Sequence, residues 1–471
     1  MTAGVDCRFM WIPKRPTLAL LFAGAVVHAG VMAVVYVKTG RIDGYAFQSL
    51  DGREYYGLAR SLLDHGVFST DSAPPHEPDT WRTPGYPLFL SLVMLLAGKS
   101  PAALIVAQQI LSVLNVLVLF AIARRLMTPG RALAVSLLFL LEPYHLLYST
   151  WLMSTTLTVT VLFATWYALL RAVERRTLIS FAVTGALSGL LVLVRPLAIL
   201  VPLAALACVV TRLLTKSRTC RSETQTRNRW VGIAVFCVFA AVTIGAWTAR
   251  NYAVSGRFAL SDQGGVVLAY FKATEVVLWE ESRTADRYLE TSLDPENVER
   301  PHRVWDDIDT RLRRRFSDST EDQAERLTWR NIAQGNKSGV DSFQVSRWLA
   351  GIAWSMLAEA PLATLGCCIV RIGENLTFPL NLAVSPPNGV GVNRAKSLAV
   401  ALPYVVLTLA AFIGMIRNRD DMSGICFPIL CAAALLLATT PQVDPRFRVP
   451  IIPLLLVIAF CNVPPAAAPD A

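Results

Sequence analysis

The feature that most constrains this fold is a series of apolar runs, several of them long enough to cross a lipid bilayer. A transmembrane helix needs about 20 consecutive, mostly apolar residues. The runs cover 17–37, 101–123, 132–149, 151–170, 178–194, 196–214, 231–249, 351–380, 398–416, 425–440 and 449–463. Charged residues make up only 17% of the 471-residue chain, below the roughly 25% of soluble domains. We therefore predict an all-α polytopic membrane protein with about 10–13 transmembrane helices.

Short basic loops between the runs predict the orientation, because Lys and Arg collect in cytoplasmic loops. The clusters are Arg124, Arg125 and Arg131; Arg171, Arg175 and Arg176; Lys216, Arg218, Arg221, Arg227 and Arg229; and Arg417 and Arg419. Placing all four clusters inside also places the N-terminus in the cytoplasm. This requires that run 84–97 does not cross as a single span, and that 361–380 is interfacial. The net charge of +10 follows from this bias, and the scattered basic residues do not indicate nucleic-acid binding.

The polar segments divide the chain into three parts. Residues 1–249 form an N-terminal transmembrane core with an outer loop at 38–83. Residues 250–350 form an extracytoplasmic, partly helical segment, and 351–471 hold C-terminal interfacial and transmembrane helices. The nine cysteines lie mostly in apolar runs, which indicates neither a disulfide framework nor a CxxC metal or redox site.

The stretch Leu50–Phe89 of the outer loop carries the first candidate site. Asp51 and Glu54 have the spacing of a capping box, in which the acid at the N-cap and the Glu three residues on close a helix start. Tyr55, Leu58, Ala59, Leu62 and Leu63 continue at helical spacing. The alternative is that Asp51 is a general base at the membrane surface. The two readings are compatible, although a carboxylate that accepts backbone N–H groups is a weaker base.

Arginines gather on the predicted outer face, where Lys and Arg are normally scarce. They are Arg82, Arg195, Arg250, Arg446 and Arg448. Each could be an anchor whose charged end reaches the headgroups. Together they suggest an anionic ligand at headgroup depth, because guanidinium groups grip phosphate oxygens in a bidentate way.

Two further ionisable pairs are weaker candidates. Glu142 and His145, in the turn EPYH, lie near a span end and are read as structural. His76 and Glu77 are two potential metal ligands, which do not make a metal site.

The chain resembles the integral-membrane GT-C glycosyltransferases of the protein O-mannosyltransferase and aminoarabinose transferase type (glycosyltransferase family 39-like). The resemblance rests on DGREYYGLARSLLDHGVFS, WRTPGYPLFLSLV, EPYHLLYSTWLMS, VLVRPLAILVPL, ARNYAVSGRFALSDQGG and PRFRVPIIPLLLVI, in this order along the chain. Many relatives carry an acid where LMSTTL has Thr155 and Thr156, and the acid pair of the mannosyltransferases is absent because Gly52 follows Asp51.

The resemblance implies a GT-C-like bundle that transfers a sugar outside the cytoplasm from a polyprenyl-phosphate donor. It implies a catalytic acidic residue in the first outer loop, which is Asp51 or, as the alternative, Glu54. It also implies basic contacts to the lipid phosphate from Arg82, Arg250, Arg446 and Arg448, with Arg195 as a further candidate. Tyr55 and Tyr56 would shape the cleft.

The expected activity is hexosyl or pentosyl transfer to a protein, lipid or glycan at the plasma (inner) membrane. We expect no required cofactor, with a divalent metal as an alternative. The competing class is a flippase that moves a lipid-linked sugar without transfer. Ionisable residues midway through spans and an inverted repeat would favour a flippase, but the charges gather outside and no inverted repeat is evident.

Overall fold

The computed structural model describes residues 14–71, 73–215, 223–282, 299–315, 342–377, 394–418, 425–440 and 444–461. Within these ranges the regular elements are all helices, which confirms the predicted fold class. The predicted cytoplasmic N-terminus at 1–13, the basic residues at 216–221 and residues 283–298 of the segment 250–350 lie outside the described residues.

Four described helices have the length and apolarity of a membrane span, and the number rises to six if each of two bent pairs is one span. The four are α1 (Lys14–Thr39), α4 (Pro101–Ala123), α7 (Thr155–Arg175) and α10 (Glu223–Ser255). The bent pairs are α5 (Pro129–Leu140) with α6 (Pro143–Ser149), at 53°, and α17 (Ser342–Glu359) with α18 (Pro361–Thr377), at 98°. The bend between α5 and α6 falls at the turn EPYH, where Pro143 cannot donate a helical hydrogen bond.

Shorter apolar helices account for the remaining runs. They are α3 (Gly85–Ala97), α8 (Leu178–Val194), η1 (Pro196–Leu200) with α9 (Val201–Thr215), the apolar part Ala401–Arg417 of α20 (Arg394–Arg417), α21 (Cys426–Thr439) and α23 (Ile452–Phe460). Their positions agree with the apolar runs of the sequence.

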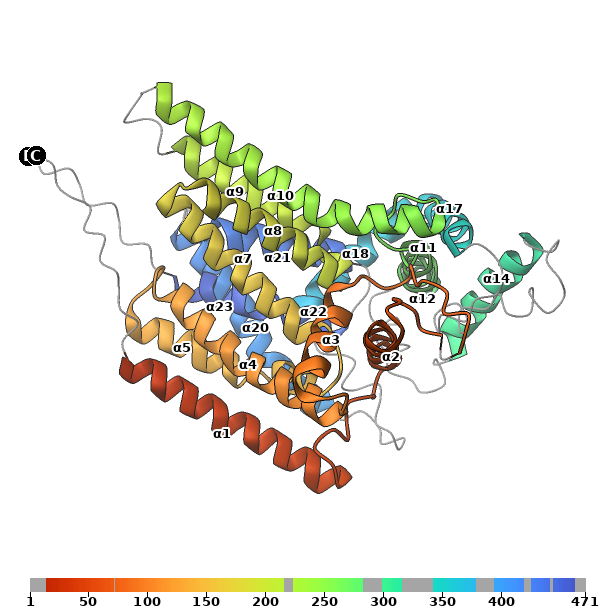
Figure 1. The fold of residues 1–471 in the computed structure, drawn as a ribbon, viewed down its shortest axis with the longest axis horizontal. Coiled ribbons are helices and arrows are strands. Elements are labelled where there is room, and N and C mark those ends of the chain that lie inside the picture. Colours follow the sequence, from red (N-terminus) through yellow and green to blue (C-terminus); the bar gives the residue numbers. More distant parts are fainter. Residues whose placement is uncertain are drawn as a thin grey trace, which may run out of the picture.

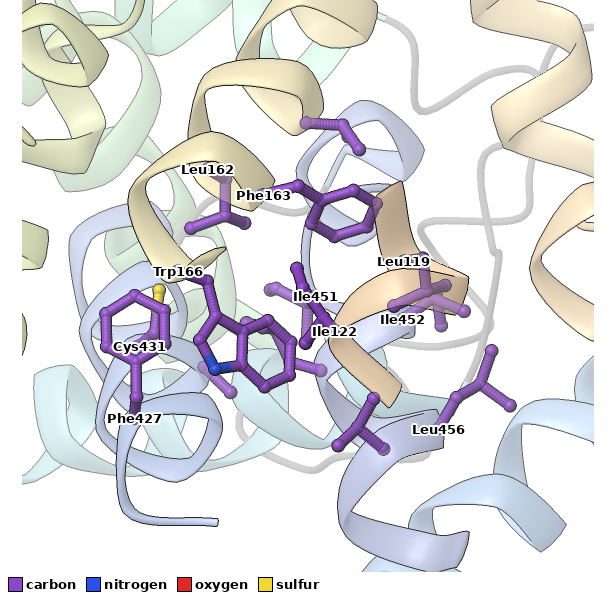
Figure 2. Close-up of a cluster of buried hydrophobic side chains, with 14 of the residues drawn as sticks. Leu119, Ile122, Leu162, Phe163, Trp166, Phe427, Cys431, Ile451, Ile452 and Leu456 are labelled. Atoms are coloured by element: carbon purple, nitrogen blue, oxygen red, sulfur yellow. The ribbon is translucent and has the colours of Figure 1, made fainter. Parts of the chain in front are cut away.

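The main core joins the first half of the chain to its last helices. Trp166 of α7 lies fully buried beside Phe427 of α21, with ring centroids 5.7 Å apart. Figure 2 shows these rings together with Ile122 of α4 and with Ile451 and Ile452 at the start of α23. Helices that are far apart in sequence therefore form one bundle around a common apolar centre.

Helices α8 and α10 approach closely through small residues. A Cβ on Gly185 would lie 2.2 Å from the backbone oxygen of Phe236, and one on Gly189 would lie 2.8 Å from Thr243. Glycines four residues apart let two helix backbones meet in this way. This contact fixes α10 against the bundle, and α10 carries Arg250 near its C-terminal end.

Helix α3 does not cross the bundle. Arg82, just before α3, pairs with Glu54 of α2 (Leu50–His65), and Lys99, just after α3, pairs with Asp64 of the same helix. Both ends of α3 therefore lie beside α2. In Figure 1, α2 is seen nearly end on, whereas α1, α4 and α10 are seen from the side. Whether 84–97 crosses the membrane stays a prediction.

Three of the basic clusters meet at one end of the bundle. Arg125 pairs with Glu174 at 2.7 Å, which joins the ends of α4 and α7. Arg417 donates to the backbone oxygen of Cys461, whose thiol lies 3.4 Å from the backbone oxygen of Leu126. The opposite end of the bundle carries α2.

A second, smaller cluster packs against Trp81 of the outer loop. It contains α11 (Gly264–Val266), the π-helical η3 (Val267–Ala273), α12 (Thr274–Ser282), α14 (Glu299–Arg315) and α17. Within 250–350, which is predicted to be partly helical, the described residues 299–315 form α14. Arg371 of α18 pairs with Glu275 of α12 and with Glu374. The interfacial placement of 361–380 stays a prediction.

Candidate functional site

Helix α2 places the outer-loop acids. Its N-cap is Ser49, whose hydroxyl accepts from the Gly52 amide at 3.2 Å, and it ends at Gly66, which has φ 69°. The capping-box prediction was therefore wrong: Asp51 lies in the first turn and does not cap the helix. Both Ser49 and Asp51 are good capping residues, and the Glu three residues after Asp51 favoured the wrong one. The carboxylate of Asp51 is therefore not used by the helix start.

Asp51 is instead held by two arginines from distant parts of the chain. Its Oδ1 accepts from Arg82 Nη2 at 2.6 Å, and its Oδ2 accepts from Arg446 Nη1 at 2.7 Å. Arg82 Nε also donates to Glu54 at 2.6 Å. Asp444 caps the short helix α22 (Pro445–Arg448) and pairs with Arg446 at 2.8 Å. The two ends of the stretch Leu50–Phe89 are therefore in contact.

This network separates the pKa values of the two acids. Burial alone would raise the pKa of Asp51, but the charges of Arg82 and Arg446 outweigh burial and hold that pKa well below its ordinary value. Burial raises the pKa of Glu54 above its ordinary value, and Arg82 offsets this only in part. Asp51 is thus the acid that stays ionised, and Glu54 lies behind Arg82.

The loop that carries Arg82 is fixed by hydrogen bonds. Asp79 accepts from the backbone N–H groups of Trp81 and Arg82, each at 3.0 Å. Arg250 Nη1 donates to the Asp79 backbone oxygen at 2.5 Å, and the Ser261 hydroxyl donates to that of Trp81 at 2.8 Å. Burial, reinforced by the nearby charge of Asp262, raises the pKa of Asp79 to about 6. The position of the Arg82 guanidinium therefore depends on the end of α10.

A cavity of about 700 Å³ opens beside Asp51. Its polar end is lined by Asp51, Tyr55, Arg82, Arg195 and Arg446. Its remaining wall is largely apolar, with residues of η1 and η3: Leu197, Ile199, Leu200, Val267, Leu268 and Phe271. The lining combines charged side chains with an apolar wall, as a site for an amphipathic ligand requires.

Arg195 is the cavity arginine whose charge is least engaged by the protein. Its side chain is buried over the ring of Phe447, at 5.0 Å from the ring centroid, and its Nη1 has no hydrogen-bond partner among the described residues. Thr155, at the start of α7, is buried in the lining, and its hydroxyl likewise has no partner in the described part of the chain. Buried polar groups are normally paired, so both atoms are positioned for a polar ligand.

The other predicted site residues lie outside this cavity. Tyr56 donates to the backbone oxygen of Lys99 at 2.8 Å. Arg448 is buried in the bundle, over the Tyr404 ring at 4.4 Å. Arg250 lines a separate groove. The structure thus brings together Asp51, Tyr55, Arg82, Arg195 and Arg446, keeps Glu54 just behind them, and places Tyr56, Arg250 and Arg448 elsewhere.

Three lining residues were missed by sequence reasoning. Gln263, with its amide oxygen turned toward the site, accepts from Arg82 Nη1 at 3.1 Å and Trp81 Nε1 at 3.3 Å. Gln263 could have been found because it lies in ARNYAVSGRFALSDQGG, one of the segments on which the resemblance rests. Thr155 stood in the segment where relatives carry an acid. Lys272 had no signal, because a π-helical turn breaks the spacing by which a helix face is recognised.

Among the described residues, no group of three or more His, Cys, Asp or Glu side chains is arranged to hold a metal ion. Glu142 is buried and caps α6, where it accepts from the Tyr404 hydroxyl at 2.8 Å. His145 lies 2.7 Å from the Ser112 hydroxyl. These two residues have structural contacts, in line with the structural reading of EPYH.

Comparison with known families places this geometry in context. Residues 79–247 match the model of the dolichyl-phosphate-mannose-protein mannosyltransferase family. This match covers less than half of the chain. The match contains Arg82 and Arg195, and it begins after α2 and Asp51. A search of the curated proteins finds no match.

Several solved structures are similar in fold. The oligosaccharyltransferase of Archaeoglobus fulgidus, tethered with an acceptor peptide, is 13% identical with a TM-score of 0.49, over 96% of this chain and 50% of that one. ArnT from Cupriavidus metallidurans, bound to undecaprenyl phosphate, is 17% identical with a TM-score of 0.38, over 92% of this chain and 77% of that one. The chain thus spans about half the length of the first of these proteins. At scores below 0.5, neither likeness supports a role for any residue.

Proposed function

We propose that this protein is a membrane glycosyltransferase that moves a sugar from a polyprenyl-phosphate donor to an acceptor outside the cytoplasm. The observation that carries the proposal is the cavity in which an ionised Asp51 and three arginines face an apolar wall. An isoprenoid chain fits the apolar wall, and a phosphate fits the charged end. The matching family model supports the same class of reaction.

The arginines divide into two roles under this proposal. Arg82 is a positioning residue, because Asp51, Glu54 and Gln263 engage its three nitrogen atoms. Arg195 and Arg446 are the phosphate contacts, since both line the cavity and Arg195 Nη1 is unpaired there. As the bond between the sugar and the phosphate breaks, these guanidinium groups stabilise the charge that develops on the leaving phosphate.

Asp51 is the group that faces the acceptor. The acceptor hydroxyl attacks the anomeric carbon, its proton passes to Asp51, and the polyprenyl phosphate leaves with the electrons of the broken bond. A carboxylate with a lowered pKa is a weak base. It suffices here because the phosphate is a good leaving group and the proton is transferred late, when the hydroxyl has become acidic.

The test is turnover by purified protein in liposomes that contain polyprenyl-phosphate sugars. We expect Asp51→Asn to lower the rate of polyprenyl-phosphate release by about 100-fold or more, the usual contribution of a general base. The matched control is Asp64→Asn, a change of the same kind on α2 at a surface ion pair with Lys99.

Undiminished turnover in Asp51→Asn would exclude Asp51 as the base. A wild-type protein that carries the labelled lipid across the bilayer and releases no polyprenyl phosphate would instead establish the flippase alternative. Measuring sugar release and lipid movement on the same liposomes separates the two classes.

A further inference from the structure

A second groove lies beside the cavity and shares none of its lining residues. It has a volume of about 550 Å³. Its wall is made by the last turns of α10, the start of α3, the end of α8 and the segment that follows α2. The lining residues are Leu62, Gly66, Val67, Phe68, Pro78, Pro84, Leu88, Leu193, Thr243, Ala246, Trp247, Arg250 and Val254. Arg250 is the one charged residue in this lining.

The groove opens on a surface that faces lipid. Helix α10 is one of the helices with the length and apolarity of a span. Beside the groove, Val242 is 61% exposed, and on its rim Leu88 is 49% exposed and Val254 is 42% exposed. An apolar surface of this kind on a membrane helix is covered by the bilayer. The natural occupant of the groove is therefore a lipid.

Arg250 supplies a charge at the end of this apolar groove. Its Nη1 is engaged by the backbone oxygen of Asp79, at 2.5 Å, and by Asn251, at 3.0 Å. The guanidinium lies over the Trp247 ring, at 4.7 Å, and near that of Phe68, at 5.6 Å. Its Nε and Nη2 have no hydrogen-bond partner among the described residues. A guanidinium fixed by two rings and one backbone bond is prepared to donate its remaining N–H groups to a phosphate.

We propose that this groove binds a phosphate-bearing lipid of the surrounding bilayer. The lipid phosphate contacts Arg250, and one acyl chain follows Ala246, Thr243 and Leu193. The site differs from that of the reacting phosphate, because Arg250 and Asp51 line different cavities.

The bound lipid also stabilises the loop that carries Arg82 beside the cavity, and the catalytic meaning of this effect rests on the proposed function. Arg250 holds the backbone of Asp79, and the Asp79 side chain holds the backbone of Arg82, which contacts Asp51. A lipid phosphate that immobilises Arg250 thus steadies the loop behind the catalytic carboxylate. Lipid binding itself needs no glycosyl transfer.

The test is native mass spectrometry of the full chain with added phosphatidylglycerol or phosphatidylcholine. Ala246→Trp fills the groove, and we expect it to reduce retention of phosphatidylglycerol about tenfold. Val242→Trp adds the same ring to the lipid-facing side of α10 outside the groove, and should retain the lipid as the wild type does. Arg250→Gln should lose the preference for phosphatidylglycerol over phosphatidylcholine.

Equal retention by wild type and Ala246→Trp would overturn the proposal. Displacement of phosphatidylglycerol by equimolar undecaprenyl phosphate would also overturn it, because the groove would then belong to the donor lipid. The readout is independent of turnover, since Asp51→Asn should retain phosphatidylglycerol fully even when it transfers no sugar. Failure of the lipid site and failure of the proposed function are therefore distinguishable.

Discussion

At the scale of single residues, Asp51 is defined by its two guanidinium partners. Arg82 occupies one carboxylate oxygen and Arg446 occupies the other. Both interactions favour the ionised form, and together they exceed the effect of burial. Asp51 is consequently a carboxylate that stays charged at any ordinary pH.

We predict that Arg446→Gln brings the loss of ionised Asp51 up into the acid end of the pH profile of kcat/KM, which in the wild type it does not reach. Loss of this guanidinium allows the pKa of Asp51 to rise, by about one to three units for a close Arg partner. Ionised Asp51 is then lost at a less acidic pH. Arg446→Lys keeps the charge and should move the limb less. A lower rate with an unmoved acid limb would show that Arg446 acts on the phosphate alone.

Asp79 gives a prediction for stability. Its pKa rises from 3.8 to about 6 on folding, so the folded state binds the proton more tightly than the unfolded state. The stability due to this group is present below pH 3.8 and is lost as the pH rises through about 6. Asp79→Asn keeps an oxygen for the N–H groups of Trp81 and Arg82 and removes this pH dependence.

The variant should thus be more stable than the wild type at pH 7.5, by on the order of 3 kcal/mol. At pH 4 this difference should largely vanish. Thermal unfolding in one detergent at the two pH values measures both quantities. An equal difference at both values would mean that the charge of Asp79 is not responsible.

At the scale of helices, close contact between backbones carries much of the architecture. The pair α8 and α10 depends on Gly185, where a side chain would meet the backbone of Phe236. We predict that Gly185→Ala destabilises the protein by about 1–3 kcal/mol, the usual cost of overpacking. Gly245 of α10 has open space around its Cβ position, so Gly245→Ala should be neutral or stabilising. Thermal unfolding of the two variants under identical conditions tests the contrast, which equal melting temperatures would contradict.

The sequence predicted which segments are helical far better than how their ends are arranged. The positions of α1, α4 and α7 follow from apolar runs, because a segment that spans a bilayer must satisfy its backbone internally. The cap of α2 was misplaced from Ser49 to Asp51, since both residues suit that position. Lys272 escaped notice because η3 is π-helical. Local patterns thus predict where a helix lies, but they do not predict which of two suitable residues caps it or where a π-helical turn occurs.

At the scale of the whole molecule, the site could be predicted only as a set of candidates. The bond between Arg446 and Asp51 joins residues 395 positions apart, and that between Arg82 and Asp51 joins residues 31 positions apart. No local pattern encodes either contact. The same limit explains why Arg250 and Arg448 were wrongly grouped with Arg446. All three are arginines predicted on the outer face of the membrane, but only Arg446 lines the cavity.

The arrangement of helix ends predicts a topology. Lys99 lies beside α2, whereas Arg125 lies at the other end of α4. A reporter phosphatase fused after Lys99 should be active outside the cytoplasm, and a fluorescent protein fused after Arg131 should be fluorescent inside it. The opposite result at Lys99 alone would mean that α3 crosses the membrane in the cell.

The contact between Asp51 and Arg446 also determines when the site can form during synthesis of the chain. Asp51 leaves the ribosome with Glu54 and shortly before Arg82, and these three can associate as soon as α3 is made. Arg446 is synthesised 395 positions after Asp51, so the charged end of the cavity stays incomplete until the chain has passed that point. A nascent chain released before residue 444 would hold the described helices up to α21 and would lack this contact.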